Sequence, residues 1–257
     1  MVASGNDFVV LEFSSSRVLE LKDLARKICD RKFGAGADGL LVLEKSKIAD
    51  IKMHIFNPDG SEAEMCGNGA HCAVSYLGKS NVKIETKAGI IEGKFDKEKV
   101  RIKLSDPGNL KLDLPIKINN RLLHVNFINT GVPHTVIFVE ALDKIEVVNL
   151  GRQIRFHKKF MPAGTNVDFV EVLDFGSIKI RTYERGVEDE TLACGTGSVA
   201  SALITNLKLK TKSFGKINVQ TKSGEILKVY FNRMDNYFRN VWLEGKAKTV
   251  YKGEYYV

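Results

Sequence analysis

Residues 64–72 (EMCGNGAHC) and residues 192–200 (LACGTGSVA) carry the same Cys-Gly-X-Gly phrase at two distant points of the chain. Small and apolar residues at helical spacing follow each phrase, which predicts a loop that opens into a helix. Backbone N–H groups lack partners at such a helix start and the helix dipole is positive there, so a thiolate is stabilised. The two phrases therefore predict a pair of acid–base thiols, Cys66 and Cys194.

The two halves of the chain repeat one another beyond these phrases. Cys194 follows Cys66 by 128 residues, and the same comparison gives 126 for Gly5 with Gly131 and 135 for Gly89 with Gly224. Further echoes match 166–172 (NVDFVEV) to 38–44 (DGLLVLE) and 179–183 to 52–56. A nearly constant offset over half the chain indicates an internal duplication. One thiol therefore belongs to each of two similar α/β domains, and the site is expected between them.

Hydrophobic periodicity and turn residues predict the secondary structure around the repeat. Helices are expected at 19–31 and from the first Cys-Gly to about Gly78, and strands at 7–13, 40–44, 51–56, 82–86, 90–95, 100–104, 135–139, 166–172 and 179–183. The glycine-rich run 34–39 is a weak phosphate-loop signal, because it lacks the Gly-Lys-Ser/Thr ending and leads into a strand.

Composition places the chain among ordinary globular proteins. Of its 257 residues, 44% are hydrophobic and 27% charged, and 39 basic against 31 acidic residues give a net charge of +8. The lysines are scattered rather than gathered in a stripe, so no nucleic-acid partner is expected. With no apolar run of about 20 residues and no signal-peptide pattern, we expect a cytoplasmic protein without membrane association.

The four cysteines do not form a disulfide framework or a metal site in this reading. Cys29 lies in an amphipathic helical stretch and Cys72 lies six residues after Cys66, so both are expected to pack in the core. The spacings match neither a CxxC motif nor a four-ligand zinc cluster. Cys66 and Cys194 remain as the chemically interesting pair.

Two similar lobes with one thiol each suit the inversion of a carbon centre. A planar carbanion held between them could lose a proton on one face and gain one on the other. One thiolate would remove the α-hydrogen and the opposite thiol would return a proton, so the two groups must differ in protonation and titrate together.

Six segments in order resemble the diaminopimelate epimerase family. They are GNDFVV at 5–10, GADGLL at 36–41, FNPDGS at 56–61, MCGNG at 65–69, YERG at 183–186 and ACGTG at 193–197. The resemblance implies interconversion of LL- and meso-diaminopimelate without a cofactor, in the route to lysine and peptidoglycan precursors. A homodimer and a small-molecule substrate are expected with it.

The resemblance also implies the architecture. Each domain is expected to be a mixed sheet or barrel wrapped around a central helix, with the active site in the cleft between them. Residues 1–113 are assigned to the first domain and 114–248 to the second, with a final strand at about 249–257 returning to the first.

The family's functional residues carry over to matching positions. Cys66 and Cys194 are the acid–base groups, His134 is a possible auxiliary group, and substrate contacts fall on Asn6, Asn57, Gly67, Asn68, Asn166, Glu184, Arg185, Gly195 and Thr196. The backbone N–H groups after each cysteine suit a carboxylate and its developing charge, and Arg185 suits a remote carboxylate. Each position also has a structural reading, such as a turn at Asn57 or a surface ion pair at Arg185.

Three alternatives share this fold. Proline racemase and hydroxyproline epimerase usually carry histidine after the first Cys-Gly, where this chain has Asn68. The phenazine-pathway isomerases lack the cysteine pair, and a non-catalytic amino-acid-binding module remains open. Within the favoured family the chain departs from common residues at Gly39, His71 and Val132, which leaves the detailed contacts open.

Overall fold

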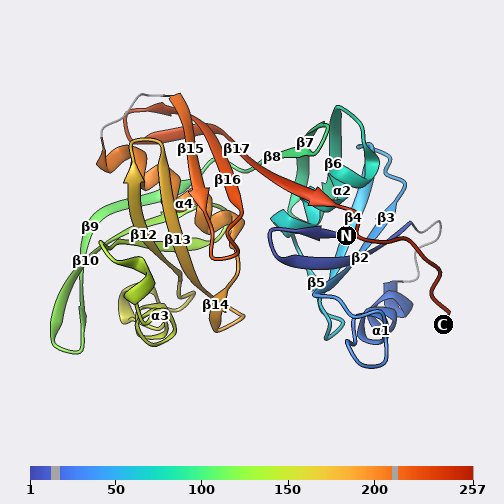
Figure 1. Ribbon diagram of the computed structural model, residues 1–257, viewed down its shortest axis with the longest axis horizontal. Helices are drawn as coiled ribbons and strands as arrows, with labels where there is room; N and C mark the ends of the chain where they lie inside the picture. Colours follow the sequence, from blue (N-terminus) through green and yellow to red (C-terminus); the bar gives the residue numbers. More distant parts are fainter. Residues whose placement is uncertain (13–17, 210–213, 257) are drawn as a thin grey trace. The chain divides into compact units, whose positions relative to one another are not determined.

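The computed structural model describes residues 1–12, 18–209 and 214–256 and divides into two compact units. The first unit is Met1–Lys103 with Glu244–Val257, and the second is Leu104–Leu243 (Figure 1). The expected boundary at residue 113 differs because β9 (Gly108–Ile118) forms a hairpin with β10 (Arg121–Asn129) and cannot be separated from it. The expected final strand was also misplaced: β17 (Tyr237–Lys248) ends before residue 249, and residues 249–256 have no regular structure.

The first unit is a closed ring of strands around one helix. Each strand pairs with the next in the order β1, β2, β3, β4, β6, β7, β8 and the end of β17, which pairs again with β1. The strand bounds are β1 Val2–Ala3, β2 Asn6–Glu12, β3 Gly39–Glu44, β4 Ile51–Phe56, β5 Glu62–Ala63, β6 Asn81–Thr86, β7 Gly89–Asp96 and β8 Lys99–Lys103. Helix α2 (Gly67–Leu77) contacts β1, β2, β3, β6, β7 and β8, while α1 (Val18–Ile28) packs on β3 and β4.

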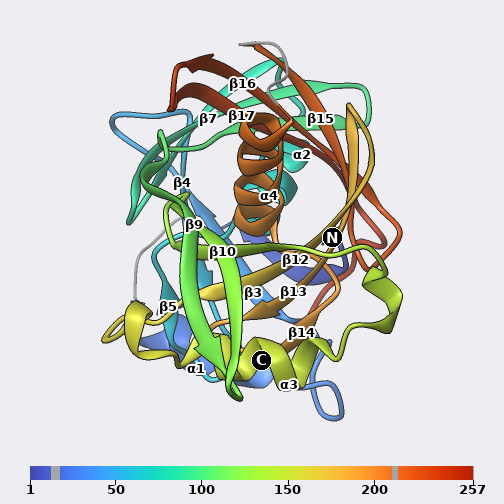
Figure 2. The ribbon, with the colours of Figure 1, turned by 90° about the vertical axis from the view of Figure 1, so that its left-hand side faces the viewer.

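The second unit repeats this arrangement. Its remaining strands are β11 Pro133–Phe138, β12 Asn166–Asp174, β13 Ser177–Glu184, β14 Asp189–Thr191, β15 Phe214–Gln220 and β16 Ile226–Met234. Helix α4 (Gly195–Lys208) is surrounded by strands (Figure 2), and α3 (Val147–Arg155) packs on β12 and β13. Two short 3-10 helices, η1 (Leu142–Lys144) and η2 (Lys158–Phe160), flank α3. The expected pairing of similar domains, each a barrel-like sheet around a central helix, is confirmed.

Strand pairing within each unit shows which residues of the two repeats correspond. Leu40 lies opposite Phe56 in the first unit, and Val167 lies opposite Tyr183 in the second, so both pairs are 127 residues apart. Leu41 lies beside Gly69 of α2, and Asp168 lies beside the matching Gly197 of α4, so Asp168 corresponds to Leu41 and the match of 166–172 to 38–44 expected from sequence was wrong by one residue. The correction matters because a slip of one residue moves every side chain to the other face of a strand.

Both central helices are buried on most of their surface because their side chains are small. Seven consecutive residues of α2 and ten of α4 are buried, and both sequences are rich in Gly, Ala, Ser and short apolar residues. A helix that is apolar all round is a core element. The further core under α1 contains Leu21, Leu40 and Phe56, and the core under α3 contains Ile154, Phe169 and Tyr183.

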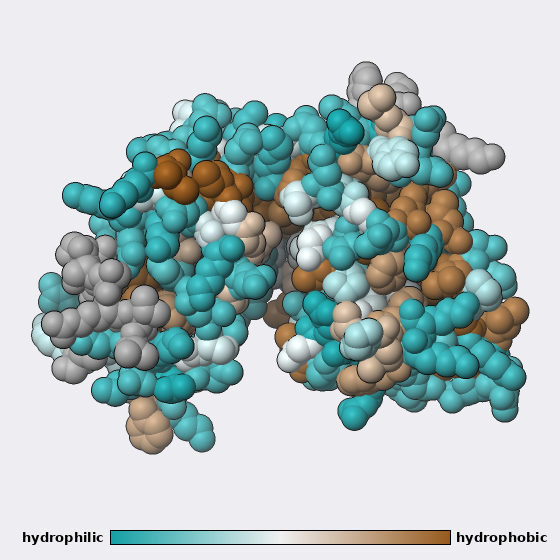
Figure 3. Space-filling model, turned by 180° about the vertical axis from the view of Figure 1, so that it is seen from behind, coloured by the Kyte–Doolittle hydropathy of each residue, from teal (hydrophilic) through white to brown (hydrophobic). Residues whose placement is uncertain are grey.

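Hydrophilic residues cover most of the face seen in Figure 3, with hydrophobic residues in patches between them. Large exposed hydrophobic side chains, such as Phe33 and Phe175, lie far apart in the sequence. Among the described residues, no helix has the length and apolar character needed to cross a membrane.

Candidate active site

Cys66 is the N-cap of α2 in the first unit. Its backbone is extended, with φ −140° and ψ 122°, and its Sγ accepts a hydrogen bond from the Gly69 amide at 3.5 Å. The thiol is partly exposed. The expected geometry, a thiol among the unsatisfied N–H groups of a helix start, is present here. His71, one turn further on, is buried and its Nδ1 donates to the Gly67 carbonyl at 2.8 Å, which is a structural role.

The side chain after the first Cys-Gly begins a chain of hydrogen bonds. Asn68 donates from Nδ2 to Asn6 Oδ1 at 2.7 Å, and Asn6 donates from Nδ2 to Asp38 Oδ2 at 3.0 Å. Arg31 closes the chain at the surface, with its guanidinium 2.7 Å from both Asp7 and Asp38. The hydrogen bond from Arg31 is the main cause of a lowered pKa at Asp7. Asn6 and Asn68, both expected in the site, are thus held together in this unit.

Asn57 lies in the turn after β4 and is exposed. Its amide donates to the Ser61 carbonyl at 2.8 Å, its Nδ2 donates to Ser61 Oγ at 2.9 Å, and its carbonyl accepts from Gly60 N at 2.9 Å. These bonds are turn chemistry, so within the structure Asn57 has a structural role and its substrate contact stays a prediction.

Cys194 is the N-cap of α4 in the second unit, but its surroundings differ from those of Cys66. It is only 6% exposed, whereas Cys66 is partly exposed. Burial raises the pKa of the Cys194 thiol well above its usual value, and the carboxylates of Glu184 and Asp168 raise it further, against opposing hydrogen bonds from Thr196 and Gly197. The thiol form of Cys194 is therefore favoured.

A second chain of hydrogen bonds begins at Cys194. Its Sγ lies 3.5 Å from Thr196 Oγ1, which lies 2.9 Å from Nε2 of His134. Nδ1 of His134 lies 2.7 Å from Asp168 Oδ2, and the Thr182 hydroxyl donates to Asp168 Oδ1 at 2.8 Å. The expected auxiliary group His134 is therefore connected to Cys194 through Thr196 and not by direct contact.

The other site residues of the second unit lie around His134. Asn166 donates from Nδ2 to the Pro133 carbonyl at 3.0 Å, and its Oδ1 accepts from the Arg185 amide at 2.7 Å. The Arg185 guanidinium donates to the Ala163 carbonyl at 3.0 Å. Burial raises the pKa of Glu184, against a hydrogen bond from Thr191 and the attraction of His134. His134, Asn166, Glu184, Arg185, Cys194 and Thr196 thus form one neighbourhood.

A buried glutamate anchors the loop before Cys66. Glu62 on β5 lies 2.7 Å from Nδ1 of His54 on β4, and Lys87 lies 2.5 Å from its other oxygen. Burial would raise the pKa of Glu62, but hydrogen bonds from Lys87 and His54 outweigh burial and lower it. The loop is therefore tied to the sheet four residues before the thiol.

The loop before Cys194 has a matching anchor. Glu190 on β14 accepts from Arg181 Nε at 2.6 Å and Nη2 at 2.8 Å, and Lys222 lies 2.9 Å from it. Here too the hydrogen bonds from the two cations overcome burial and lower the pKa of Glu190. Since Glu190 also lies four residues before its cysteine, the two anchors are related by the duplication, with arginine in place of histidine.

Glycines in the first turn of each helix allow close packing on different neighbours. A Cβ added at Gly69 would lie 3.0 Å from Leu41 Cδ2 and 3.7 Å from Ile55 Cδ1. A Cβ added at Gly197 would lie only 2.3 Å from Asp168 Oδ1. The helix start is thus over apolar side chains in the first unit and over a buried carboxylate in the second.

Sequence reasoning missed Asp168, Thr182 and the two anchoring glutamates. Asp168 was visible as a charged residue within the strand NVDFV, which is unusual for a buried strand unless the charge has a partner. The correct register pairs it with Thr182 on the neighbouring strand. Within the described residues, no group of His, Cys, Asp and Glu side chains is arranged to hold a metal ion.

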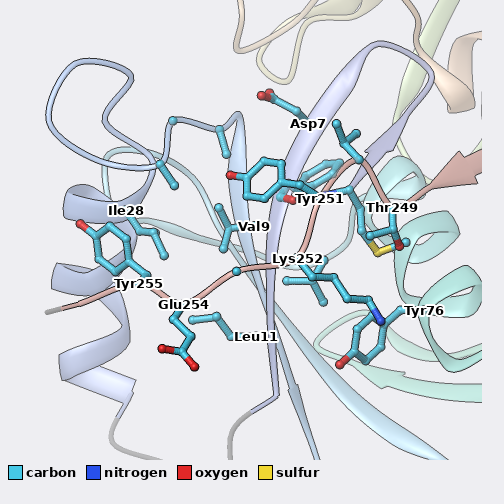
Figure 4. A pocket seen from close by; sticks show the side chains of 18 residues that line it. Asp7, Val9, Leu11, Ile28, Tyr76, Thr249, Tyr251, Lys252, Glu254 and Tyr255 are labelled. Atoms are coloured by element: carbon cyan, nitrogen blue, oxygen red, sulfur yellow. Dashed lines mark hydrogen bonds between the residues drawn. The ribbon is translucent and has the colours of Figure 1, made fainter.

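A pocket of about 420 Å³ lies elsewhere in the first unit. Side chains of β2 such as Val9 and Leu11 line it from one side, and residues 249–255 after β17, including Tyr251 and Tyr255, line it from the other (Figure 4). None of the candidate site residues lines this pocket.

A family model described as diaminopimelate epimerase matches residues 1–110 and 126–250. The chain is 41% identical to "Diaminopimelate epimerase" of Aquifex aeolicus (strain VF5), covering 97% of this chain and 94% of that protein. It is 40% identical to the protein of the same name from Methanocella arvoryzae, covering 99% and 94%.

Two solved structures share the fold at low sequence identity. A PhzF-family phenazine biosynthesis protein of Bacillus anthracis has a TM-score of 0.74 and 19% identity, covering 95% of this chain and 91% of that chain. A probable proline racemase of Agrobacterium radiobacter K84 has a TM-score of 0.68 and 16% identity, covering 95% and 86%. At such identities the likeness concerns the fold alone.

Proposed function

The chain belongs to the diaminopimelate epimerase family, and we propose that it interconverts LL- and meso-diaminopimelate by proton transfer at the α-carbon. One observation carries the proposal: Cys66 and Cys194 are the N-caps of two helices related by the duplication. Relatives of that name match nearly the whole chain, and both cysteines lie within the matched ranges. The expected place in metabolism is the supply of lysine and peptidoglycan precursors.

In the proposed reaction, the thiolate of one cysteine removes the α-hydrogen and the thiol of the other protonates the opposite face of the carbanion. Cys66 is partly exposed and its sulfur accepts a hydrogen bond from an amide N–H, so it is suited to be the thiolate in the resting enzyme. Buried Cys194, whose pKa is raised by burial and by two carboxylates, suits the thiol. The reverse reaction starts from the opposite protonation of the pair.

No pyridoxal-type electron sink takes part in this proposal, so the developing charge must be stabilised by the protein. The backbone N–H groups of Gly67 and Asn68, and those of Gly195 and Thr196, lie in the first turns of α2 and α4. Such groups bind a carboxylate and the charge that grows on it as the α-hydrogen leaves.

The remaining residues are proposed to bind the distal amino acid centre of the substrate. Arg185 supplies a planar fork of N–H donors for a carboxylate, and its amide is fixed by Asn166. Glu184 and the asparagines at 6, 57 and 166 are proposed to orient the ammonium groups. Proline has no distal centre, so these residues favour diaminopimelate over the racemase substrates.

The test is an exchange screen in heavy water with diaminopimelate, proline and hydroxyproline, followed by proton NMR at the α-position. We expect exchange and inversion with diaminopimelate only. Exchange of the α-hydrogen with proline alone would indicate a proline racemase. Binding of diaminopimelate without exchange would indicate a non-catalytic module.

We also propose that the protein is a cytoplasmic homodimer, as the family resemblance implies. Light scattering at micromolar concentration would give twice the mass of the 28.6 kDa chain. A mass equal to one chain at all concentrations would contradict the dimer, and recovery of the native protein outside the cytoplasmic fraction would contradict the location.

A further inference from the structure

The polar chain behind Cys194 contains two ionisable groups that water does not reach. The side chains of His134 and Asp168 are both 0% exposed, and they are 2.7 Å apart. Burying an imidazole and a carboxylate costs free energy even when they are paired. Their burial therefore calls for a reason beyond packing.

The first unit shows that the fold itself does not need these groups. At the positions related by the duplication, Leu41 stands in place of Asp168, Ile55 in place of Thr182 and Phe8 in place of His134. All three apolar side chains are buried, and Leu41 and Ile55 lie beside Gly69 of α2. The polar set is thus particular to the half of the molecule that holds Cys194.

The hydrogen bonds assign each member a direction. Asp168 accepts from Thr182 at one oxygen, and its other oxygen lies 2.7 Å from Nδ1 of His134, so an ionised Asp168 holds a hydrogen on Nδ1. Nε2 of the neutral ring is then an acceptor for the Thr196 hydroxyl at 2.9 Å. The Thr196 oxygen is left to accept from the Cys194 thiol at 3.5 Å.

We propose that Asp168 is a positioning residue that fixes the tautomer of His134, and that the Thr196 hydroxyl relays a proton between Cys194 and His134. In the relay the S–H bond of Cys194 breaks as an O–H bond forms at Thr196, and the original hydroxyl hydrogen passes to Nε2. The products are a thiolate and an imidazolium, and the reverse step restores the thiol. The net charge of the chain does not change, and the Asp168 carboxylate stabilises the imidazolium.

The relay gives Cys194 a buried partner that stores its proton. Burial raises the pKa of this thiol, and Glu184 and Asp168 on neighbouring strands raise it further, so direct loss of a proton to solvent is disfavoured. Transfer to His134 places the proton between the thiolate and Asp168 instead. Cys66, in contrast, is partly exposed, and its sulfur accepts the Gly69 amide.

The test measures alkylation of each cysteine by iodoacetamide at pH 7, with peptide mapping to separate Cys194 from Cys66. Thr196→Val keeps the shape of the side chain and removes the relay together with the direct hydrogen bond to Cys194, so we expect alkylation of Cys194 to slow about tenfold, as for one unit of pKa. Thr196→Ser restores the hydroxyl and the rate. Thr205→Val is the control, because the hydroxyl of this buried threonine of the same helix donates to the Ser201 carbonyl at 2.7 Å.

Asp168→Asn separates the relay from a simple charge effect by the sign of the change. If Asp168 acted only as a nearby negative charge, its removal would lower the pKa of Cys194 and speed alkylation. The relay requires slower alkylation, because the imidazolium loses its carboxylate. The rate at Cys66 should not change in any of these variants.

The proposal depends on the proposed function only for the effect on turnover. There we expect kcat to fall about 10²-fold in Thr196→Val and Asp168→Asn, and to recover in Thr196→Ser. Alkylation uses no diaminopimelate, so a wild-type protein that fails to epimerise this substrate would contradict the function and leave the relay standing. Faster alkylation in Asp168→Asn, or a rate within twofold of wild type in Thr196→Val, would overturn the relay.

Discussion

The side chains that follow the two Cys-Gly pairs begin polar chains of opposite character. Asn68 leads through Asn6 and Asp38 to Arg31, whose side chain is 59% exposed. Thr196 leads through His134 to Asp168, where no solvent reaches. One chain ends in screened surface charge and the other in a buried ion pair.

The difference shows what a duplication keeps and what it changes. The helix start, the cysteine N-cap and the glutamate anchor recur in both units, because they set the position of the thiol. The layer beneath the helix does not recur, and in the second unit it adds the Asp168 carboxylate to the burial and the Glu184 charge that raise the pKa of Cys194. A two-base epimerase requires one thiolate and one thiol at a time, so unequal environments suit the reaction.

The largest expected effect comes from removing either thiol. Cys66→Ala and Cys194→Ala should each lower the rate of epimerisation by about 10³-fold or more, because each removes one of two required acid–base groups. The measurement is inversion of LL-diaminopimelate followed by circular dichroism. Cys72→Ala is the matched control: Cys72 is buried in α2, burial raises its pKa to about 12, and we expect turnover within about twofold of wild type. Near-normal turnover in either active-site variant would remove the two-thiol mechanism.

Alanine substitutions at Gly69 and Gly197 should have different effects, because different side chains lie beneath the two helix starts. Gly197→Ala places a Cβ 2.3 Å from Asp168 Oδ1, so the carboxylate must move, and we expect a loss of about 1–3 kcal/mol of stability together with most activity. Gly69→Ala meets only the tip of Leu41 at 3.0 Å, and alanine's helix propensity offsets that contact to within about 1 kcal/mol. Urea unfolding of both variants measures the difference. Equal losses would contradict the contrast between the layers.

The two glutamate anchors, Glu62 and Glu190, should both stabilise the fold at neutral pH and lose this contribution as the pH falls. The pKa values of Glu62 and Glu190 are lowered from 4.5 in the folded protein, so their ionised forms favour the native state. Their contribution is present above pH 4.5 and is lost as pH falls through the lowered folded values. Glu190→Gln should cost about 1–3 kcal/mol at pH 7 and flatten the loss of stability below pH 4.5.

Urea midpoints between pH 3 and pH 7 measure this effect for each anchor. Glu62→Gln is the paired variant, and we expect the same flattening with a smaller cost at pH 7, since His54 replaces the bidentate arginine of the second unit. A wild-type acid slope retained in both variants would show that other carboxylates cause it.

The smallest effect is expected at Arg31, the exposed end of the hydrogen-bond chain that begins at Asn68. Arg31→Gln removes ion pairs with Asp7 and Asp38 that water screens, so stability should change by no more than about 1 kcal/mol. The side chain of Asn6 stays bonded to Asn68 and Asp38. A loss of activity comparable to that of Thr196→Val would show that the two hydrogen-bond chains are equivalent.

Much of the architecture was predictable from local patterns in the sequence. The strands expected at 51–56 and 82–86 are β4 and β6 within one residue, and the helix expected to end near Gly78 does so, with Gly78 in the left-handed conformation at its end. These elements follow from alternation, small-residue helices and turn residues, all of which act over a few positions. The family resemblance and the two cysteines rested on motifs of the same short range.

The chemistry of Cys194 was not predictable in that way. Its buried state and its distance from the carboxylates of Asp168 and Glu184 depend on strands that are neighbours only after folding. The offset used to match β12 to β3 was wrong by one residue. The sequence therefore did not show that Asp168 on β12 lies opposite Thr182. The final strand was placed after residue 248 on the family resemblance alone, whereas residues 249–255 line a pocket beside β2.

The most direct test of the two-thiol reaction follows the label in heavy water during the first few per cent of turnover. LL-diaminopimelate is added to the wild-type protein, and mass spectrometry measures deuterium separately in the meso product and in the remaining substrate. The account predicts one solvent deuterium at the inverted carbon of the product and none in the remaining substrate, because one thiolate takes the hydrogen and a different, exchanged thiol returns deuterium. Product that retains the original hydrogen would contradict it.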